Sequence, residues 1–174
     1  MANTRNRKPY SMNDWLVHPS YGIGQVKKIE KKLIEGKKIK FYRVEGEHSI
    51  YWLPVEGLEA SRVRRLASRD QFRKAIKLLK TAPREMDPDH TKRRSRIKEV
   101  MTTGSLRSVV RAIRDLSARN SEKRLSDTER RSLEQFIDSL VEEWAIAEEI
   151  EMHEARSELK EMLDEGFAAS SASN

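Results

Sequence analysis

The sequence predicts an α+β protein, in which a small N-terminal β-barrel is followed by an all-α helical domain. Up to about Leu66, short apolar segments alternate with polar residues and are separated by glycine turns. From Ser68 onward, the apolar residues recur at helical spacing instead. The chain has 174 residues, which leaves room for two small domains. We therefore expect a β domain at residues 14–66 and a helical domain at residues 67–165.

Four or five short strands are expected in the first domain. They cover residues 15–17, 25–33, 39–44, 50–54 and a brief segment near 62–63. Glu35-Gly36-Lys37 has the composition of a hairpin turn, and Glu45-Gly46-Glu47 that of a second turn. Short strands at this spacing are typical of a strongly curved barrel, which usually leaves one strand edge open when it is this small. Residues 1–13 are expected to form a disordered basic tail.

Helix start and stop signals divide the second domain. The expected helices cover residues 68–80, 88–104, 105–119 and 126–147, with a last apolar stripe at residues 155–163. Ser126-Asp127-Thr128-Glu129 is a capping box, and Gly104 is a stop signal. Trp144 lies in an apolar stripe, which favours a place in the core. Near Glu149 the stripe shifts, which indicates either two helices or one bent helix, and residues 166–174 are expected to be a disordered tail.

Positive charge is concentrated in the middle of the chain. Residues 1–59 carry 11 basic and 7 acidic side chains, residues 60–131 carry 22 and 9, and residues 132–174 carry 2 and 12. The net charge of +13 in the middle segment favours a polyanionic partner, because such a block attracts phosphates. The alternative is that lysine and arginine only keep a helical surface soluble.

Two neighbouring helices carry the residues most suited to nucleic acid. Residues 92–98 are the densest basic run, and basic residues near a helix N-terminus suit phosphate contacts. The next helix carries three arginines away from its apolar residues. A solvated helix surface is the alternative. The DNA-binding residues expected from this pattern are Lys92, Arg93, Arg94, Arg96, Arg107, Arg111 and Arg114.

Several classes of site have no support in the sequence. There is no cysteine, which excludes disulfides and thiolate chemistry and fits a reducing cytoplasm. The four histidines match no metal-binding spacing, and no phosphate loop or nucleophile arrangement is recognisable. The N-terminus lacks the apolar core of a secretory signal, and no apolar run approaches the ~18 residues of a membrane span. We therefore expect no enzyme, no cofactor, no small-molecule substrate and no membrane.

Three further stretches are distinctive. They are His18-Pro19-Ser20-Tyr21-Gly22-Ile23-Gly24 with Ile29-Glu30; Leu53-Pro54-Val55-Glu56; and a helical set of Leu78-Leu79, Arg93, Glu99 to Gly104, Val109-Val110-Arg111-Asp115-Leu116 and Leu125-Ser126. Together they resemble the bacterial CarD/CdnL family of RNA polymerase-binding transcription regulators, over residues 14–163. The first two are shared with the equivalent module of the transcription-repair coupling factor, and the third separates the chain from that ATPase.

The resemblance implies a Tudor-like barrel that pairs with the lobe of the RNA polymerase β subunit. It also implies a helical domain that contacts promoter DNA at the upstream edge of the transcription bubble and stabilises the open complex. The family's basic polymerase contacts match Lys32 loosely, and Trp52 occupies the position before Leu53-Pro54. Because Tyr51 and Trp52 are adjacent in one strand, one of them should face outward, as a surface anchor or as a lid on the barrel. Lys32, Tyr51 and Trp52 are the expected polymerase-binding residues.

The resemblance also draws attention to His90. In many family members a tryptophan just before the basic helix wedges into the minor groove, a known use of bulky apolar side chains. Counting back from Glu99 and Gly104 places that position at His90, and there is no tryptophan between Trp52 and Trp144. His90 therefore joins the expected DNA-binding residues. Either His90 stacks on a base more weakly than tryptophan would, or the fork at the upstream edge of the bubble is stabilised only by charged contacts to the DNA backbone.

We therefore expect a cytoplasmic, monomeric, non-enzymatic regulator of transcription initiation, with the RNA polymerase β subunit and promoter DNA as its partners. One alternative is a general nucleic-acid-binding, nucleoid-type protein that acts without polymerase. Another is a polymerase-bound assembly factor, whose acidic last helices would form the partner surface.

Overall fold

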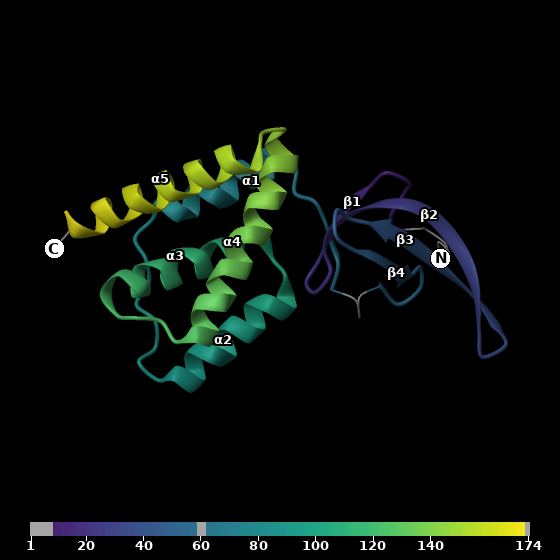
Figure 1. The fold of residues 1–174 in the computed structure, drawn as a ribbon, viewed down its shortest axis with the longest axis horizontal. Coiled ribbons are helices and arrows are strands. Elements are labelled where there is room, and N and C mark those ends of the chain that lie inside the picture. Colours follow the sequence, from purple (N-terminus) through teal and green to yellow (C-terminus); the bar gives the residue numbers. More distant parts are fainter. Residues whose placement is uncertain (1–8, 59–61, 173–174) are drawn as a thin grey trace, which may run out of the picture. The chain divides into compact units, whose positions relative to one another are not determined.

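The computed structural model describes residues 9–58 and 62–172, and the chain divides into two compact units, Met1–Leu66 and Ala67–Asn174. Strands build the first unit and helices build the second (Figure 1). The predicted α+β class is therefore confirmed.

The N-terminal unit is one antiparallel sheet with the spatial order β4-β3-β2-β1-β5. Its strands are β1 (Trp15–His18), β2 (Gly22–Ile34), β3 (Lys37–Glu45), β4 (Ile50–Pro54) and β5 (Arg64–Arg65). The hairpin turn expected at Glu35-Gly36-Lys37 is present, but Lys37 already pairs with Ile34, so the loop between β2 and β3 has only two residues. Both loop residues, Glu35 and Gly36, have left-handed backbones, with φ values of 49° and 76°. This is the geometry of a type I′ turn, whose twist matches that of the strands.

The sheet does not close into a barrel, which corrects the sequence-based expectation. β4 and β5 are its two edges, and within residues 9–58 and 62–172 no strand pairing joins them. β5 has only two residues and pairs with β1 alone. The left-handed backbone of Arg62 (φ 52°) places it in a turn, so this strand begins at Arg64 and not near residue 62. Strands this short are insufficient to complete a closed sheet.

Alternation of side chains gives the sheet a buried inner face and an exposed outer face. The inner face holds the core of the unit, which consists of Leu16, Val26, Tyr42, Val44, Tyr51 and Leu53. Tyr10 packs against Tyr42, with ring centroids 5.8 Å apart, and its hydroxyl donates to the carbonyl oxygen of Val63 at 3.3 Å. Residues 9–13, expected to belong to a tail, are therefore partly held by the sheet. Residues 1–8 of that expected tail lie outside the described part of the chain.

The helical unit has one core that extends across all its helices. The helices are α1 (Arg69–Ile76), the 3₁₀ helix η3 (Lys77–Lys80), α2 (His90–Thr103), α3 (Leu106–Glu122), α4 (Asp127–Glu148) and α5 (Met152–Ser171). Capping boxes at Ser68 and Ser126 begin α1 and α4, and the one at Ser126 is the capping box that the sequence predicts. Trp144 is 1% exposed and packs against Phe72, which confirms its expected place in the core.

After α4 the chain forms a second, separate helix, and this helix includes residues that were expected to be a disordered tail. Glu149 takes a left-handed backbone (φ 58°) and separates α4 from α5, so two helices are present. Residues 166–171, expected in a tail, form the last turns of α5. Gly166 lies against η3: a Cβ atom at this position would stand 2.5 Å from the carbonyl oxygen of Leu79. This close approach of the two backbones requires glycine.

Candidate functional site

The outer sheet face presents an ordered tryptophan. Trp52 is 41% exposed and lies on β4, an edge strand. Its indole N–H donates to Glu30 Oε2 at 3.0 Å, and Lys32 Nζ lies 3.6 Å from the ring centroid. The hydrogen bond from Trp52, together with the nearby Lys28 ammonium, lowers the pKa of Glu30 and keeps it charged. A side chain held this way loses little conformational freedom when a partner covers it, which favours binding.

Tyr51 points to the opposite side of the sheet. It is 4% exposed, and its ring stacks on that of Tyr21 with centroids 5.1 Å apart. Its hydroxyl is buried with no hydrogen-bond partner among the described residues, and burial raises its pKa. Trp52 is therefore the outward member of the pair, and burial disfavours the expected polymerase contact at Tyr51.

His18 holds the turn beside these tyrosines, a role that sequence reasoning missed. Its Nδ1 accepts hydrogen bonds from the backbone N–H groups of Ser20, at 2.9 Å, and Tyr21, at 3.1 Å. Burial lowers the pKa of His18, so the neutral imidazole needed for these bonds is favoured. The His-Pro-Ser-Tyr-Gly phrase was recognisable in the sequence, but the imidazole acceptor was not.

Helix α2 presents basic residues along one exposed side. Asp89 caps its start by accepting from the N–H of Thr91 at 2.8 Å, and a left-handed Gly104 ends it, as predicted. His90, Arg94 and Lys98 follow one another at intervals of four residues and are all exposed. Residues at this spacing share a helix face. The face therefore offers one aromatic and two cationic side chains to a partner.

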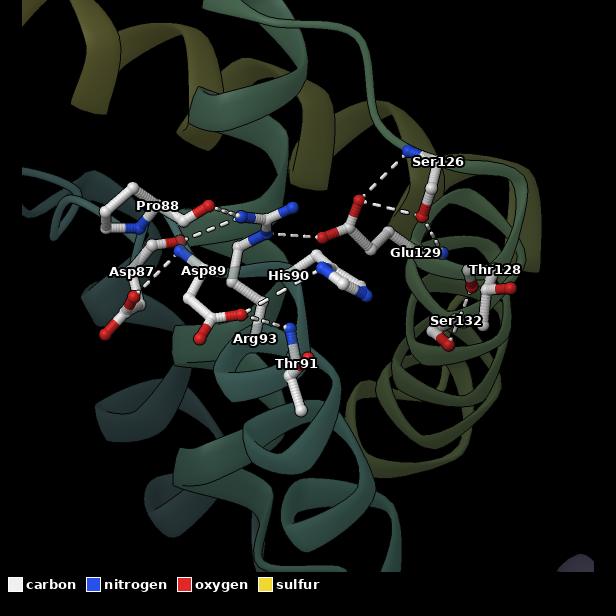
Figure 2. A network of polar contacts seen from close by, with 10 residues as sticks. All are labelled: Asp87, Pro88, Asp89, His90, Thr91, Arg93, Ser126, Thr128, Glu129 and Ser132. Carbon is white, nitrogen blue, oxygen red and sulfur yellow. Dashed lines mark hydrogen bonds and ion pairs between the residues drawn. The ribbon is translucent and has the colours of Figure 1, made fainter.

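Arg93 belongs to the interior of the helical unit and not to this face. It is 7% exposed, and its Nε donates to Glu129 Oε1 at 2.6 Å. Its Nη1 donates to the carbonyl oxygens of Asp87, at 2.9 Å, and Pro88, at 2.7 Å (Figure 2). Burial alone would raise the pKa of Glu129, but hydrogen bonds from Arg93 and Ser126 together lower it below its ordinary value. Arg93 is thus not available to DNA, contrary to expectation.

Asp115 forms ion pairs with two more of the expected DNA-binding arginines. This carboxylate is 1% exposed and accepts from Arg114 Nε at 2.8 Å and from Arg96 Nη2 at 2.7 Å. The backbone N–H of Arg84 adds a third hydrogen bond at 3.0 Å. Arg114 is 5% exposed, so it too is unavailable to DNA, whereas Arg96 keeps part of its guanidinium in solvent.

The remaining expected contacts are on the surface. Lys92 is exposed, and its Nζ lies 3.6 Å from Oδ2 of Asp87. In α3, Arg107 and Arg111 are exposed at a spacing of four residues, and neither has an ion pair within the described ranges. A sequence signal could have identified Arg93 as buried, because it falls at the same i, i+4, i+7 spacing as the buried Ile97 and Val100. The exposed set is His90, Lys92, Arg94, Lys98, Arg107 and Arg111.

Comparison with known protein families matches both units. Residues 10–67 match the model of the CarD-like/TRCF RID domain, and residues 74–160 match the model of the CarD C-terminal domain. The chain belongs to the CarD/CdnL family. This confirms the resemblance seen in the sequence.

CarD-family membership makes this a protein of a transcription-associated family that interacts with RNA polymerase. The family consists of transcription factors without enzymatic activity. Across the described ranges of this CarD-family chain, no cluster of side chains is suited to holding a metal ion. Over the same ranges, no helix is long and apolar enough to cross a membrane.

Proposed function

We propose that this CarD-family protein is a cytoplasmic, monomeric, non-enzymatic regulator that binds the RNA polymerase β subunit through its sheet. In the same complex, its helical unit contacts promoter DNA at the upstream edge of the bubble and stabilises the open complex. The observation that supports the proposal most is that the two units present different kinds of surface. One presents an anchored tryptophan on an edge strand, and the other presents an exposed basic helix face.

The proposed polymerase contact is centred on Trp52 and Lys32. β4 is an outermost strand, so its free backbone groups are open to pairing with a strand of the partner. Beside it, the Trp52 ring supplies the large, ordered apolar contact that often dominates interface energetics. The test is binding of the isolated β lobe to the full chain. Trp52→Ala should weaken binding by about 30-fold, because such an anchor is worth about 2 kcal/mol or more.

Charge reversal gives a second arm of this test. Lys32→Glu should also weaken binding, since it removes the ammonium above the Trp52 ring. Lys31→Glu is the matched control, because Lys31 is the neighbouring residue and points to the other face of the strand. If Trp52→Ala and Lys32→Glu both bind like the wild type, the outer sheet face is not the polymerase contact.

The proposed DNA contact is the exposed side of α2 and α3. Because Arg93 and Arg96 have partners inside the unit, the informative variant is Arg94→Gln with Lys98→Gln. Removing two phosphate contacts should lower the slope of log affinity against log salt by about 2. Lys74→Gln with Lys77→Gln is the control of equal charge on exposed residues of α1 and η3. A wild-type slope in the Arg94/Lys98 variant would exclude this face.

His90 provides the test at the promoter fork. Its side chain is 81% exposed at the start of α2, where a stacking contact is possible. Aromatic stacking on an unpaired base is worth about 1–3 kcal/mol, and indole offers a larger ring than imidazole. His90→Trp should lengthen the lifetime of the open complex, and His90→Ala should shorten it modestly. Three equal lifetimes would show that residue 90 does not stack at the fork.

The nucleoid-type alternative makes a different prediction about polymerase dependence. A general DNA-binding protein should bind DNA equally well with and without polymerase. The proposed regulator should bind promoter DNA weakly alone and more tightly in the polymerase complex. Measuring the affinity of the full chain for one promoter fragment in both states separates the two functions.

A further inference from the structure

The β2–β3 hairpin extends beyond the rest of the sheet as a two-stranded ribbon (Figure 1). β1 pairs with β2 only at residues 22–25. On the other side, β4 and the residue after it bond to β3 only at residues 40–45. The outer part of the hairpin, as far as the turn at Glu35-Gly36, therefore consists of two strands that pair only with each other.

The hairpin that contains this ribbon is strongly basic. Residues 27–40 contain seven lysines and two glutamates, a net charge of +5. On the outer face, Lys28 pairs with Glu30 at 3.5 Å and Lys32 lies over the Trp52 ring. Those two lysines already have partners within the sheet.

Among the described residues, the lysines on the other face of the ribbon have no such partners. Lys38 and Lys40 continue the side of β3 that carries the buried Tyr42, and Lys31 lies on the same side of β2. All three lysines are exposed, and none forms an ion pair with any residue in the described ranges. Leu33 lies on the same face, opposite Lys38, and is 70% exposed. We call Lys31, Leu33, Lys38 and Lys40 the inner lysine face.

The register of the hairpin places like charges together on this face. Lys31 is directly opposite Lys40, and Leu33 is opposite Lys38. Like charges at directly opposed positions destabilise a β-ladder. Because no described acidic side chain compensates this repulsion, an anionic partner would relieve it.

We propose that the inner lysine face binds the phosphate backbone of duplex DNA, as a second contact in addition to α2 and α3. Phosphate suits it better than an acidic protein surface does, because lysine is depleted in protein–protein interfaces. Lysine is a flexible point charge that meets phosphates without sequence preference. A two-stranded ribbon also fits the width of a DNA groove, where Leu33 would supply an apolar contact.

This contact is compatible with polymerase binding but does not depend on it. The proposed polymerase contact uses Lys32 and Trp52 on the outer face, whereas the inner lysine face is on the opposite side of the same strands. Polymerase binding and DNA binding by the ribbon can therefore fail separately in an experiment.

The test uses the full chain and a duplex DNA fragment without polymerase. The variant Lys31→Gln/Lys38→Gln/Lys40→Gln should lower the slope of log affinity against log salt by about 2.7, because each phosphate contact contributes about 0.9. The loss of affinity between about 50 and 200 mM salt should accordingly become about 40-fold smaller. Lys74→Gln/Lys77→Gln/Lys160→Gln changes the net charge equally on exposed helical residues and should leave the slope close to that of the wild type.

A folding measurement accompanies the binding measurement. The ribbon variant should melt at the same temperature as the wild type or higher, because the repulsion between Lys31 and Lys40 has been removed. A wild-type slope in the folded ribbon variant would overturn the proposal, and so would a decrease no larger than that of the control. A wild-type slope combined with lost polymerase binding would also overturn it, because the face would then bind an acidic protein surface.

Discussion

The β2–β3 ribbon and helices α2 and α3 are both rich in basic residues, but they use their charges differently. On the inner lysine face of the ribbon, the charged side chains are all exposed and have no ion pair within the described ranges. In the helices, Arg93 and Arg114 are buried, and each donates one hydrogen bond to a buried carboxylate. A net charge counted along the chain therefore overstates the positive charge exposed on the helical unit.

The difference between lysine and arginine explains this division. A guanidinium has several donors in a fixed plane, so Arg93 satisfies a carboxylate and two backbone carbonyls at the same time. An ammonium is more strongly hydrated and has no such fixed geometry, which suits an exposed position. We infer that the buried arginines stabilise the fold, and that the exposed basic residues of both units are available to phosphates.

The largest effect on stability is expected at Arg93, and it tests whether this arginine belongs to the interior. Arg93→Ala leaves Glu129 buried without its charge partner, and breaking a buried ion pair in this way costs about 3–5 kcal/mol. The free energy of unfolding in urea measures the loss. Arg94→Ala, one residue further along the same helix, should change it by no more than about 0.5 kcal/mol. Equal losses in the two variants would contradict the assignment of Arg93 to the interior.

The close packing of the helical unit is tested at Gly166. Gly166→Ala places a methyl group against the backbone of Leu79 and Lys80, where no side chain can move aside. Forcing an extra carbon into a packed site costs about 1–3 kcal/mol. The same urea unfolding measurement applies, with the exposed Glu161→Ala in α5 as the control. A variant as stable as the wild type would show that α5 does not contact η3 this closely.

The two units should also respond to acid in different pH ranges. Both His18 and Glu129 have a pKa that is lower in the folded state than in the unfolded chain. A lowered pKa contributes stability above the unfolded value, and this stability is lost as pH falls through the folded value. The N-terminal unit should therefore weaken below a pH of about 6.5, and the helical unit only below about 4.3.

Amide NMR signals from each unit, followed in urea at several pH values, measure this difference. His18→Asn provides the control, because the asparagine Oδ1 is at the δ position of the side chain, like Nδ1, and can accept the same hydrogen bonds but does not titrate. In that variant the N-terminal unit should lose the decrease in stability that the wild type shows as pH falls below about 6.5. If the two units of the wild type weaken together, His18 does not stabilise the turn as described.

The smallest effect is expected at the turn of the ribbon, which is stabilised by its backbone more than by burial. Glu35 has a left-handed backbone that asparagine adopts more readily, and Asn-Gly is the preferred sequence for this turn. Glu35→Asn should therefore stabilise the fold by less than about 1 kcal/mol. The measurement is the melting temperature, which should rise slightly. Glu35→Gln also removes the charge but lacks the backbone preference. If the two variants gain equally, the gain comes from charge and not from the turn.

Features that depend on a few adjacent residues could be predicted from the sequence. The capping box at Ser126, the helix stop at Gly104 and the hairpin turn at Glu35-Gly36 all appear as expected. Each involves backbone groups within about four residues, so local composition is sufficient. The family resemblance likewise rests on residues that could be read directly from the chain.

Other features were decided by contacts between distant parts of the chain. Arg93 is buried because Glu129, 36 residues away, provides a carboxylate beside it. Gly166 is part of a helix that packs on η3, although its composition resembles a tail. The sheet stays open because its last strand has only two paired residues. Burial, close approach and strand closure depend on which surfaces meet, and local composition does not specify that.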